Sequence, residues 1–387
     1  MPDKVRVGIA GLGAQGSMYA GLIADGRVPH MAIGAICDAS PAKELVVTSK
    51  YPGAAFYSDY AVMLDSGDID AVVICGPHYL HPEMGIAALE HDIHTLVEKP
   101  AGVYSKQVNE LNAVAAGKPE LTFAIMFNQR VNPLYQSIKE IVNSGQIGGI
   151  RHNSWIITTW WRPQAYYDQS AWRGTWGGEG GGVLVNQAPH QLDLWQWICG
   201  MPQSVYAKAG YGFRHNIDVE DEVTAVVDYG GGATGVLVTA THDVIGTDRF
   251  EILGDNGKIV VDNSSTATVI RLKAPERELS ESIETEEIGK LLSGQLDTTE
   301  YYTTETLEFE SPWGVQHAAL LDNFAASILD GTPLVASGSE GINGVRLANA
   351  IHLSSWTGAE VTLDFDDDEY LSHLNRLIAE EGKFSTR

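Results

Sequence analysis

The sequence predicts two structural units: an α/β domain with a parallel sheet, then an α+β domain with a large, mostly antiparallel open sheet. Up to residue 126, short apolar runs alternate with helical segments, and a glycine-rich turn follows the first run. Such alternation is typical of a parallel sheet covered by helices on both faces. After residue 127, glycine turns separate successive strand patterns instead. We therefore expect domains over residues 1–126 and 127–387.

The apolar runs of the first domain predict its strands, and the segments between them predict its helices. Pro41 after Ser40 suits the start of one helix, because proline fits the first turn and serine is a good N-cap. The expected strands are residues 5–10, 31–37, 70–75, 93–98 and 122–126, and the expected helices are residues 18–24, 41–50, 82–90 and 105–116.

The second domain begins with an expected helix at residues 131–143, followed by an irregular stretch, rich in Trp, Gly and Tyr, that runs to residue 182. The polar residues 274–304 predict a surface insertion, and the acidic run 364–369 a solvated surface. Hairpin turns are expected at Gly230-Gly231-Gly232 and Asp255-Asn256-Gly257. The expected strands are residues 204–211, 222–228, 233–241, 250–253, 258–261 and 268–272, and the further helices are residues 187–199, 313–329 and 340–355.

The 387 residues include 50 acidic and 25 basic side chains, a formal net charge of −25. Charge of this sign repels phosphate backbones and anionic lipids, so we expect no nucleic-acid or membrane partner. Cys37, Cys75 and Cys199 are far apart in the sequence, which favours reduced thiols. The first expected strand begins close to Met1, and no apolar run approaches the roughly 20 residues of a membrane span. We therefore expect a cytoplasmic protein.

A phosphate-binding turn is predicted directly after the first strand. Residues 11–16 have the spacing Gly-x-Gly-x-x-Gly before an expected helix, the fingerprint of a Rossmann dinucleotide-binding domain. Asp38 ends the second strand, where a carboxylate binds ribose hydroxyls and repels a 2′-phosphate, and no arginine follows it closely. We expect NAD rather than NADP; the alternative is a glycine turn beside an ordinary surface aspartate. The expected contacts are Gly11, Gly13, Ala14, Gln15, Gly16 and Asp38.

The segment after the third expected strand predicts further cofactor contacts at Gly76, Pro77, His78 and His81. The His-x-x-His spacing permits a zinc site, but no second cysteine or carboxylate cluster supports one. We expect these histidines to line the nucleotide cleft or to cap the helix at Pro82, and we expect no metal.

Lys99 stands in Val97-Glu98-Lys99-Pro100, at the end of another short apolar strand. Ligands of open α/β sheets bind outside the carboxyl ends of the strands. An amine at this position can hydrogen-bond a substrate oxygen while the cofactor takes a hydride. We therefore expect Lys99 to act in the chemistry, with Glu98 beside the cofactor.

A second dense patch runs from Gly180-Gly181-Gly182 into an expected helix. The glycines allow a close approach to a ligand. Asn186, His190 and Asp193 are spaced to share one helix face, and an imidazole is the best proton acceptor near neutral pH. The alternative is a helix start with a capping Asn and a satisfied core histidine.

These motifs, in this order, resemble the glucose-fructose oxidoreductase, inositol dehydrogenase and rhizopine-catabolism (Gfo/Idh/MocA) family. The resemblance covers nearly the whole chain: the glycine fingerprint, Glu98-Lys99-Pro100, Trp172-Arg173, the glycine triplet, His190-x-x-Asp193 and the late Ser337–Gly341 before a helix. It implies an NAD(P)-dependent dehydrogenase of sugars or cyclic polyols. Relatives commonly associate through the open face of the second sheet, so a homodimer or homotetramer is also implied.

The resemblance also implies residue roles, with Lys99 and His190 as the catalytic pair. Many relatives carry Asp where this chain has Asn186, and an amide cannot take up charge, so Asn186 is expected to orient the substrate. The implied substrate contacts are Asn186, Asp193, Gln129, Arg130, Trp172 and Tyr167, and the implied further cofactor contacts are Glu98, Lys99, Asn128, Trp172 and Arg173.

Aromatic residues bear on the substrate, because flat rings stack on sugar C–H faces as readily as they fill a core or an interface. Their density between residues 155 and 176 favours a glucose-like or anhydrosugar ring. We expect oxidation of a secondary hydroxyl to a ketone, at carbon 3 of a glucoside or levoglucosan. The alternatives are an inositol 2-dehydrogenase, an NAD-assisted glycosidase and a non-enzymatic NAD-binding regulator. The stretch comprises Trp155, Trp160, Trp161, Tyr166, Tyr167, Trp172 and Trp176.

Overall fold

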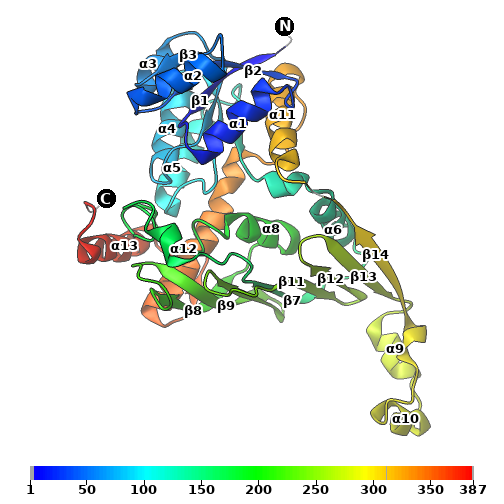
Figure 1. Ribbon diagram of the computed structural model, residues 1–387. Helices are drawn as coiled ribbons and strands as arrows, with labels where there is room; N and C mark the ends of the chain where they lie inside the picture. The colour runs from blue at the N-terminus through cyan, green and yellow to red at the C-terminus, as the bar shows by residue number, and fades with distance from the viewer. Residues whose placement is uncertain (1–3, 311, 386–387) are drawn as a thin grey trace.

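The computed structural model describes residues 4–310 and 312–385. Its first sheet contains the strands β1 (Val5–Ala10), β2 (Met31–Cys37), β3 (Ala55–Tyr57), β4 (Ala71–Ile74), β5 (His94–Val97) and β6 (Phe123–Ile125). Within the described residues these six strands are parallel, in the order β3-β2-β1-β4-β5-β6 (Figure 1). The strand order reverses between β1 and β4, and ligands of such sheets bind at this switch point.

Helices cover both faces of the first sheet because its strands are apolar on both sides. In β4, Ala71 and Val73 pack into one apolar cluster, and Val72 and Ile74 pack into another. The expected parallel sheet is confirmed, and strand and helix boundaries mostly agree within a few residues. The helices are α1 (Ala14–Ala24), α2 (Glu44–Lys50), α3 (Tyr60–Asp65), α4 (Leu80–Glu90), α5 (Ser105–Ala116) and α11 (Val315–Asp330).

The second sheet is large and mostly antiparallel, as expected. It contains β7 (Ile150–Ile157), β8 (Ser204–Tyr211), β9 (Glu220–Gly230), β10 (Ala233–Ala240), β11 (Asp248–Gly254), β12 (Gly257–Asp262), β13 (Thr266–Leu272), β14 (Tyr302–Glu308) and β15 (Val361–Thr362). In the described part of the chain its order is β14-β13-β12-β11-β7-β10-β9-β8-β15, and β7 pairs parallel with β10.

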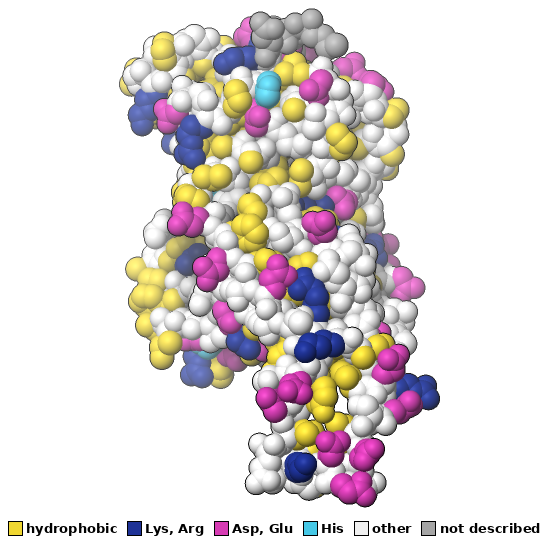
Figure 2. All heavy atoms as spheres, turned by 90° about the vertical axis from the view of Figure 1, so that its right-hand side faces the viewer, with side chains coloured by type: hydrophobic (Ala, Val, Ile, Leu, Met, Phe, Trp, Pro, Cys, Tyr) yellow, Lys and Arg dark blue, Asp and Glu magenta, His cyan; other side chains and the backbone are white. Residues whose placement is uncertain are grey.

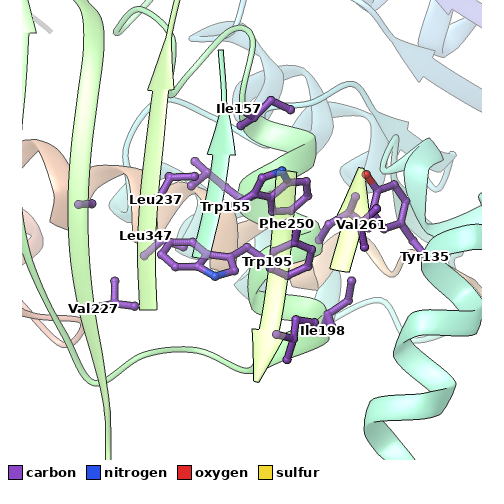
Figure 3. Packing of buried hydrophobic residues seen from close by; sticks show 14 of the residues in the cluster. Tyr135, Trp155, Ile157, Trp195, Ile198, Val227, Leu237, Phe250, Val261 and Leu347 are labelled. Carbon is purple, nitrogen blue, oxygen red and sulfur yellow. The ribbon is translucent and has the colours of Figure 1, made fainter. Parts of the chain in front are cut away.

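One face of this sheet packs against α6 (Pro133–Asn143), α8 (Pro189–Cys199) and α12 (Gly341–Thr357). Between sheet and helices, Trp155 stacks on Phe250 with ring centroids 4.4 Å apart, and Trp195 packs beside them (Figure 3). The Trp195 indole nitrogen donates to Asn153 Oδ1 at 2.6 Å. The opposite face is open, because the alternate residues Ile156 and Val226 are exposed. The sheet therefore buries one face and leaves the other free.

The remaining helices are α7 (Gln164–Tyr167), α9 (Glu276–Ser282), α10 (Ile288–Leu292) and α13 (Asp367–Glu381), with 3₁₀ turns at Pro41–Lys43, Asn128–Val131, Thr285–Glu287, Thr298–Tyr301 and Gly338–Glu340. α9 and α10 form an extension beyond β13 and β14, as the expected surface insertion implied (Figure 1). Acidic, basic and apolar side chains intermingle on the face that Figure 2 presents. No helix of the described residues is both long and apolar enough to cross a membrane.

The expectation of an irregular stretch before residue 182 is wrong at β7, a central strand of the second sheet. Its partners β10 and β11 follow it by more than 70 residues, so its pairing has no local signal. β3, α3, β14 and α13 were likewise not predicted. The acidic run is not wholly solvated, since Asp367 accepts hydrogen bonds from Ser105 Oγ at 2.5 Å and from Arg346 at 3.1 Å.

The chain returns to the first sheet near its end. Leu321 and Phe324 of α11 are fully buried in the same apolar cluster as Val7 and Ile9 of β1. The first core therefore includes residues from both sides of residue 126, and the division into domains at 1–126 and 127–387 stays a prediction.

Candidate active site

The glycine-rich loop after β1 has the shape that a dinucleotide requires. Gly11 has a φ of +99°, and a side chain there would meet the Cys75 carbonyl oxygen at 2.8 Å. A side chain at Gly16 would lie 1.9 Å from the Gly11 carbonyl oxygen, so helix α1 packs directly on the loop. A side chain at Gly13 would meet no atom within 4 Å, because this position faces open space. The loop thus leaves room for a pyrophosphate beside the start of α1.

Asp38 lies beside this loop, at the end of β2. Its Oδ2 accepts a hydrogen bond from the Leu12 amide at 2.8 Å, and its Oδ1 accepts one from Ser40 at 2.9 Å. The Lys43 ammonium donates to the Leu12 carbonyl oxygen at 3.0 Å. Lys43 was not predicted from the sequence, and its charge lies beside the glycine loop near Asp38.

A cleft with a volume of about 740 Å³ extends from the glycine loop to Lys99 and Asn186. Most of the expected cofactor contacts line it: Gly11, Gly13, Ala14, Gln15, Asp38, Gly76, Pro77, His78, His81, Glu98, Lys99, Trp172 and Arg173. Tyr166, from the aromatic stretch expected to bear on the substrate, and Cys75 also line the cleft, as do Tyr79, Leu80, Gly178 and Phe384, which were not predicted. Segments from both halves of the chain therefore form the walls of one cleft.

Lys99 is held at the inner end of the cleft. Glu98 is buried, and its Oε2 accepts a hydrogen bond from the Lys99 amide at 2.9 Å, while its Oε1 accepts one from the Tyr19 hydroxyl. The Lys99 ammonium donates to the Asn186 carbonyl oxygen at 2.9 Å. Burial lowers the pKa of Lys99, and the carboxylates of Glu98 and Glu179 oppose that shift. The ammonium has further protons to donate to a ligand.

His190 lies in the first turn of α8. Its Nδ1 is buried and has no hydrogen-bond partner among the described residues. Burial lowers the pKa of His190 well below the usual value, and the charges of Lys99 and His317 lower it further. The ring is therefore neutral at pH 7, with a nitrogen free to bind or accept a proton.

The histidines of the cofactor segment are held by backbone oxygens. His81 Nδ1 lies 2.7 Å from the Pro100 carbonyl oxygen and its Nε2 lies 2.8 Å from that of Gly76. His78 Nδ1 lies 2.9 Å from the Glu179 carbonyl oxygen, and burial lowers the pKa of His78 to about 3. Over residues 4–310 and 312–385, no group of three or more His, Cys, Asp or Glu side chains could hold a metal ion.

Asp193 and Arg130 contact each other and do not line the cleft. The Arg130 guanidinium donates to both carboxylate oxygens of Asp193, at 2.7 and 2.9 Å, and to Glu340 at 2.7 Å. The side chains of Arg130 and Asp193 are each 1% exposed. Gln129 accepts a hydrogen bond from Asn132 at 3.2 Å. In this structure Asp193 and Arg130 pair with each other inside the core, and the expected substrate contacts of both stay predictions.

The aromatic residues divide between the cleft and the core. Trp172 and Tyr166 line the cleft. Trp155 and Trp176 are buried, and so is Tyr167, whose hydroxyl donates to Thr241 Oγ1 at 2.9 Å. The expected substrate contact of Tyr167 is thus a core hydrogen bond in this structure.

Two further residues near Lys99 were not predicted. His317, in the first turn of α11, has Nδ1 3.4 Å from the buried Asn128 Nδ2, so Asn128 lies here and not in the cleft lining. Burial and the charge of Lys99 lower the pKa of His317 to about 4. Glu179 is 1% exposed and accepts a hydrogen bond from the Asn186 side chain. Burial raises the pKa of Glu179 to about 7. No motif marks His317, whereas Glu179 directly precedes the glycine triplet, and the properties of both depend on burial.

The chain is similar to known oxidoreductases over most of its length. Residues 5–125 match the NAD-binding Rossmann-fold domain of the GFO/IDH/MocA oxidoreductase family, and residues 135–260 match a C-terminal domain of that family. The chain is 30% identical to the oxidoreductase YrbE of Bacillus subtilis (strain 168) over 274 residues, 70% of this chain and 77% of that protein.

Two further relatives have named substrates. The chain is 26% identical to the myo-inositol 2-dehydrogenase of Thermotoga maritima over 271 residues, 69% of this chain and 78% of that protein. A levoglucosan dehydrogenase solved in complex with NADH and levoglucosan has the same fold, with a TM-score of 0.78 and 20% identity, covering 94% of this chain and all of that one.

Proposed function

Because the chain belongs to the GFO/IDH/MocA family of NAD-binding oxidoreductases, we propose that it oxidises a secondary hydroxyl of a cyclic sugar or polyol to a ketone. The observation that carries this proposal is the Lys99 ammonium in the cleft, near enough to a neutral His190 to lower its pKa, and the buried His190 Nδ1, which has no hydrogen-bond partner among the described residues. The substrate would lie between these side chains and the cofactor.

In this proposal Lys99 and His190 act on the substrate hydroxyl. The Lys99 ammonium binds the oxygen and stabilises the negative charge that develops on it. His190, which is neutral because burial lowers its pKa, accepts the hydroxyl proton and passes it on to solvent. NAD supplies the hydride acceptor when it is bound. One C–H and one O–H bond break, a C=O bond forms, and the products are the ketone, NADH and a proton.

The cofactor residues follow from the loop geometry. The glycine loop and the start of α1 bind the pyrophosphate, and the Asp38 carboxylate binds the ribose hydroxyls. Trp172 and Arg173 lie near the nicotinamide or the substrate.

We propose that the substrate is an uncharged cyclic compound. The flat faces of Trp172 and Tyr166 in the cleft suit the C–H face of a pyranose, so carbon 3 of a glucose-like sugar or levoglucosan is the first candidate. An inositol is the second, because the myo-inositol 2-dehydrogenase of Thermotoga maritima is similar over 69% of this chain. Asn186 offers one donor and one acceptor to orient either ring.

We also propose that the chain forms a homodimer or homotetramer through the open face of the second sheet, where Ile156, Tyr206 and Val226 are exposed. Light scattering coupled to size exclusion measures the state directly. A charged substitution of Val226 is expected to release monomers, and an unchanged mass would contradict this assignment.

NADH formation tests the activity. Purified protein is given NAD or NADP with a panel of inositols, glucose, glucosides, xylose and levoglucosan, and NADH absorbance is followed. An increase in absorbance with NAD and one of these compounds identifies the substrate class. Lys99→Ala and His190→Ala, as folded proteins, serve as controls. A flat trace across the panel, with NAD still bound to the protein, would reject the dehydrogenase and favour the NAD-assisted glycosidase or the regulator.

A further inference from the structure

Glu179 is a buried carboxylate that the proposed reaction does not use. Its Oε1 accepts a hydrogen bond from Asn186 Nδ2, and its Oε2 accepts one from the Gly174 amide at 2.8 Å. With 1% of the residue exposed, neither oxygen depends on solvent. Both carboxylate oxygens of Glu179 therefore have hydrogen-bond partners, and one of these partners, the side chain of Asn186, belongs to a residue that lines the cleft.

The same part of the cleft carries two half-buried cations, Lys99 and Arg173. The Lys99 ammonium donates to the Asn186 carbonyl oxygen at 2.9 Å, and Arg173 Nη1 lies 3.7 Å from Glu179 Oε1. Asn186 thus joins the ammonium through its backbone and the carboxylate through its side chain. Its amide carries no charge, so the negative charges that act on the ammonium are those of Glu98, the neighbouring residue, and of Glu179. A buried cation requires such a partner to stay protonated.

We propose that Glu179 is a positioning residue for Lys99: it holds Asn186 in place as the partner of the ammonium and adds its negative charge to that of Glu98 beside the ammonium. The expected effect on the reaction rate rests on the proposed oxidation. The arrangement of Glu179, Asn186 and Lys99 rests on the contacts alone. Glu179 itself does not touch the substrate.

The charges around Glu179 predict the direction of its pH effect. Burial raises the pKa of Glu179 to about 7, and the charge of Glu220 also raises it. The hydrogen bonds from Gly174 and Asn186 and the charge of Arg173 act in the opposite direction. As the pH rises through this value, Glu179 loses its proton, and its charge raises the pKa of Lys99. The other groups that face Glu179 are Tyr166, Tyr167 and His78.

Both oxygens of Glu179 accept hydrogen bonds, so its protonation disturbs the contact that holds Asn186. The rate of oxidation should therefore rise with pH through about 7, and Glu179→Gln should remove this rise. We expect kcat to fall about tenfold or more in Glu179→Gln, because the hydrogen bond from Asn186 loses the assistance of a charge. Adding Asn186→Asp restores one carboxylate and reverses the donor and acceptor of the hydrogen bond. The double variant is expected to recover most of the lost kcat.

Glu381→Gln is the matched control. Glu381 accepts hydrogen bonds from the amides of Trp176 and Gly177, at 2.7 and 2.8 Å, so it holds the same loop without contacting Asn186. We expect its pH profile to match that of the wild type. An equal loss in Glu381→Gln, or no recovery in the folded double variant, would overturn the proposal in favour of simple loop disruption.

Infrared titration of the protein alone tests the same group without any substrate. The wild type is expected to show a carboxylic acid band that titrates near neutral pH, and Glu179→Gln is expected to lack it. A difference spectrum without that band would refute the inference even if the enzyme is active. If the band is present and no substrate is ever oxidised, the proposed function fails and the assignment of Glu179 as the ionised neighbour of Lys99 stands.

Discussion

Replacing Asp193 with alanine separates a structural role of this residue from a substrate contact. Asp193 accepts two hydrogen bonds from Arg130 and one from Gln196 at 3.0 Å, all inside the core. Removing one partner of a buried ion pair leaves the other charge uncompensated and costs about 3–5 kcal/mol. Glu340 still contacts Arg130 but is partly exposed, so it offsets only a fraction of that cost. We therefore expect Asp193→Ala to lose about 3–5 kcal/mol of unfolding free energy.

Urea unfolding, followed by tryptophan fluorescence, measures this loss, and steady-state kinetics measure KM on the same variant. We expect KM to change little, because Asp193 does not line the cleft. The paired change Arg130→Met with Asp193→Leu is expected to cost far less than Asp193→Ala, since it leaves no unpaired charge. A loss below about 1 kcal/mol together with a tenfold rise in KM would refute the reasoning and return Asp193 to the substrate site.

Four further outcomes are expected. Lys99→Ala and His190→Ala should each lower kcat about 10²–10⁴-fold while NADH binding, measured by fluorescence, changes little; activity within a few-fold of the wild type would contradict their roles. Asp38→Ser should raise the ratio of NADP to NAD activity, because the carboxylate no longer repels a 2′-phosphate; an unchanged ratio would contradict this. Trp155→Ala should cost about 3–5 kcal/mol by removing a stacked core ring, with KM unchanged in any folded sample. In the folded protein His317 stays neutral down to its pKa of about 4, but in the unfolded chain it gains a proton below about pH 6.5. Lowering the pH from 6.5 to 4 should therefore reduce the unfolding free energy of the wild type more steeply than that of His317→Asn. Parallel stability curves over this range would refute this prediction.

The cofactor half of the site could be predicted from the sequence because its signals are local. Gly11 and Gly16 are required by the geometry of a turn of a few residues, and Asp38 follows directly from the end of a strand. Most strands of the parallel sheet are buried on both faces, so they are short apolar runs that are recognisable without their partners; β3, which is only partly buried, was missed. Lys99 was predicted for the same reason, as the residue that follows such a run.

The tertiary structure alone decided which polar groups meet. β7 was missed because its partners β10 and β11 are far away in the sequence, and a strand of mixed polarity is defined by its neighbours. Glu179 and His317 acquire their properties from burial beside Lys99, and burial cannot be read from the residues next to them. The resemblance implied substrate contacts at Arg130 and Asp193, and only the fold shows that the two form a buried ion pair with each other. Local backbone and apolar patterns determined the framework, whereas the pairing of buried charges required the packed chain, because desolvation and Coulomb energy depend on distances between remote residues.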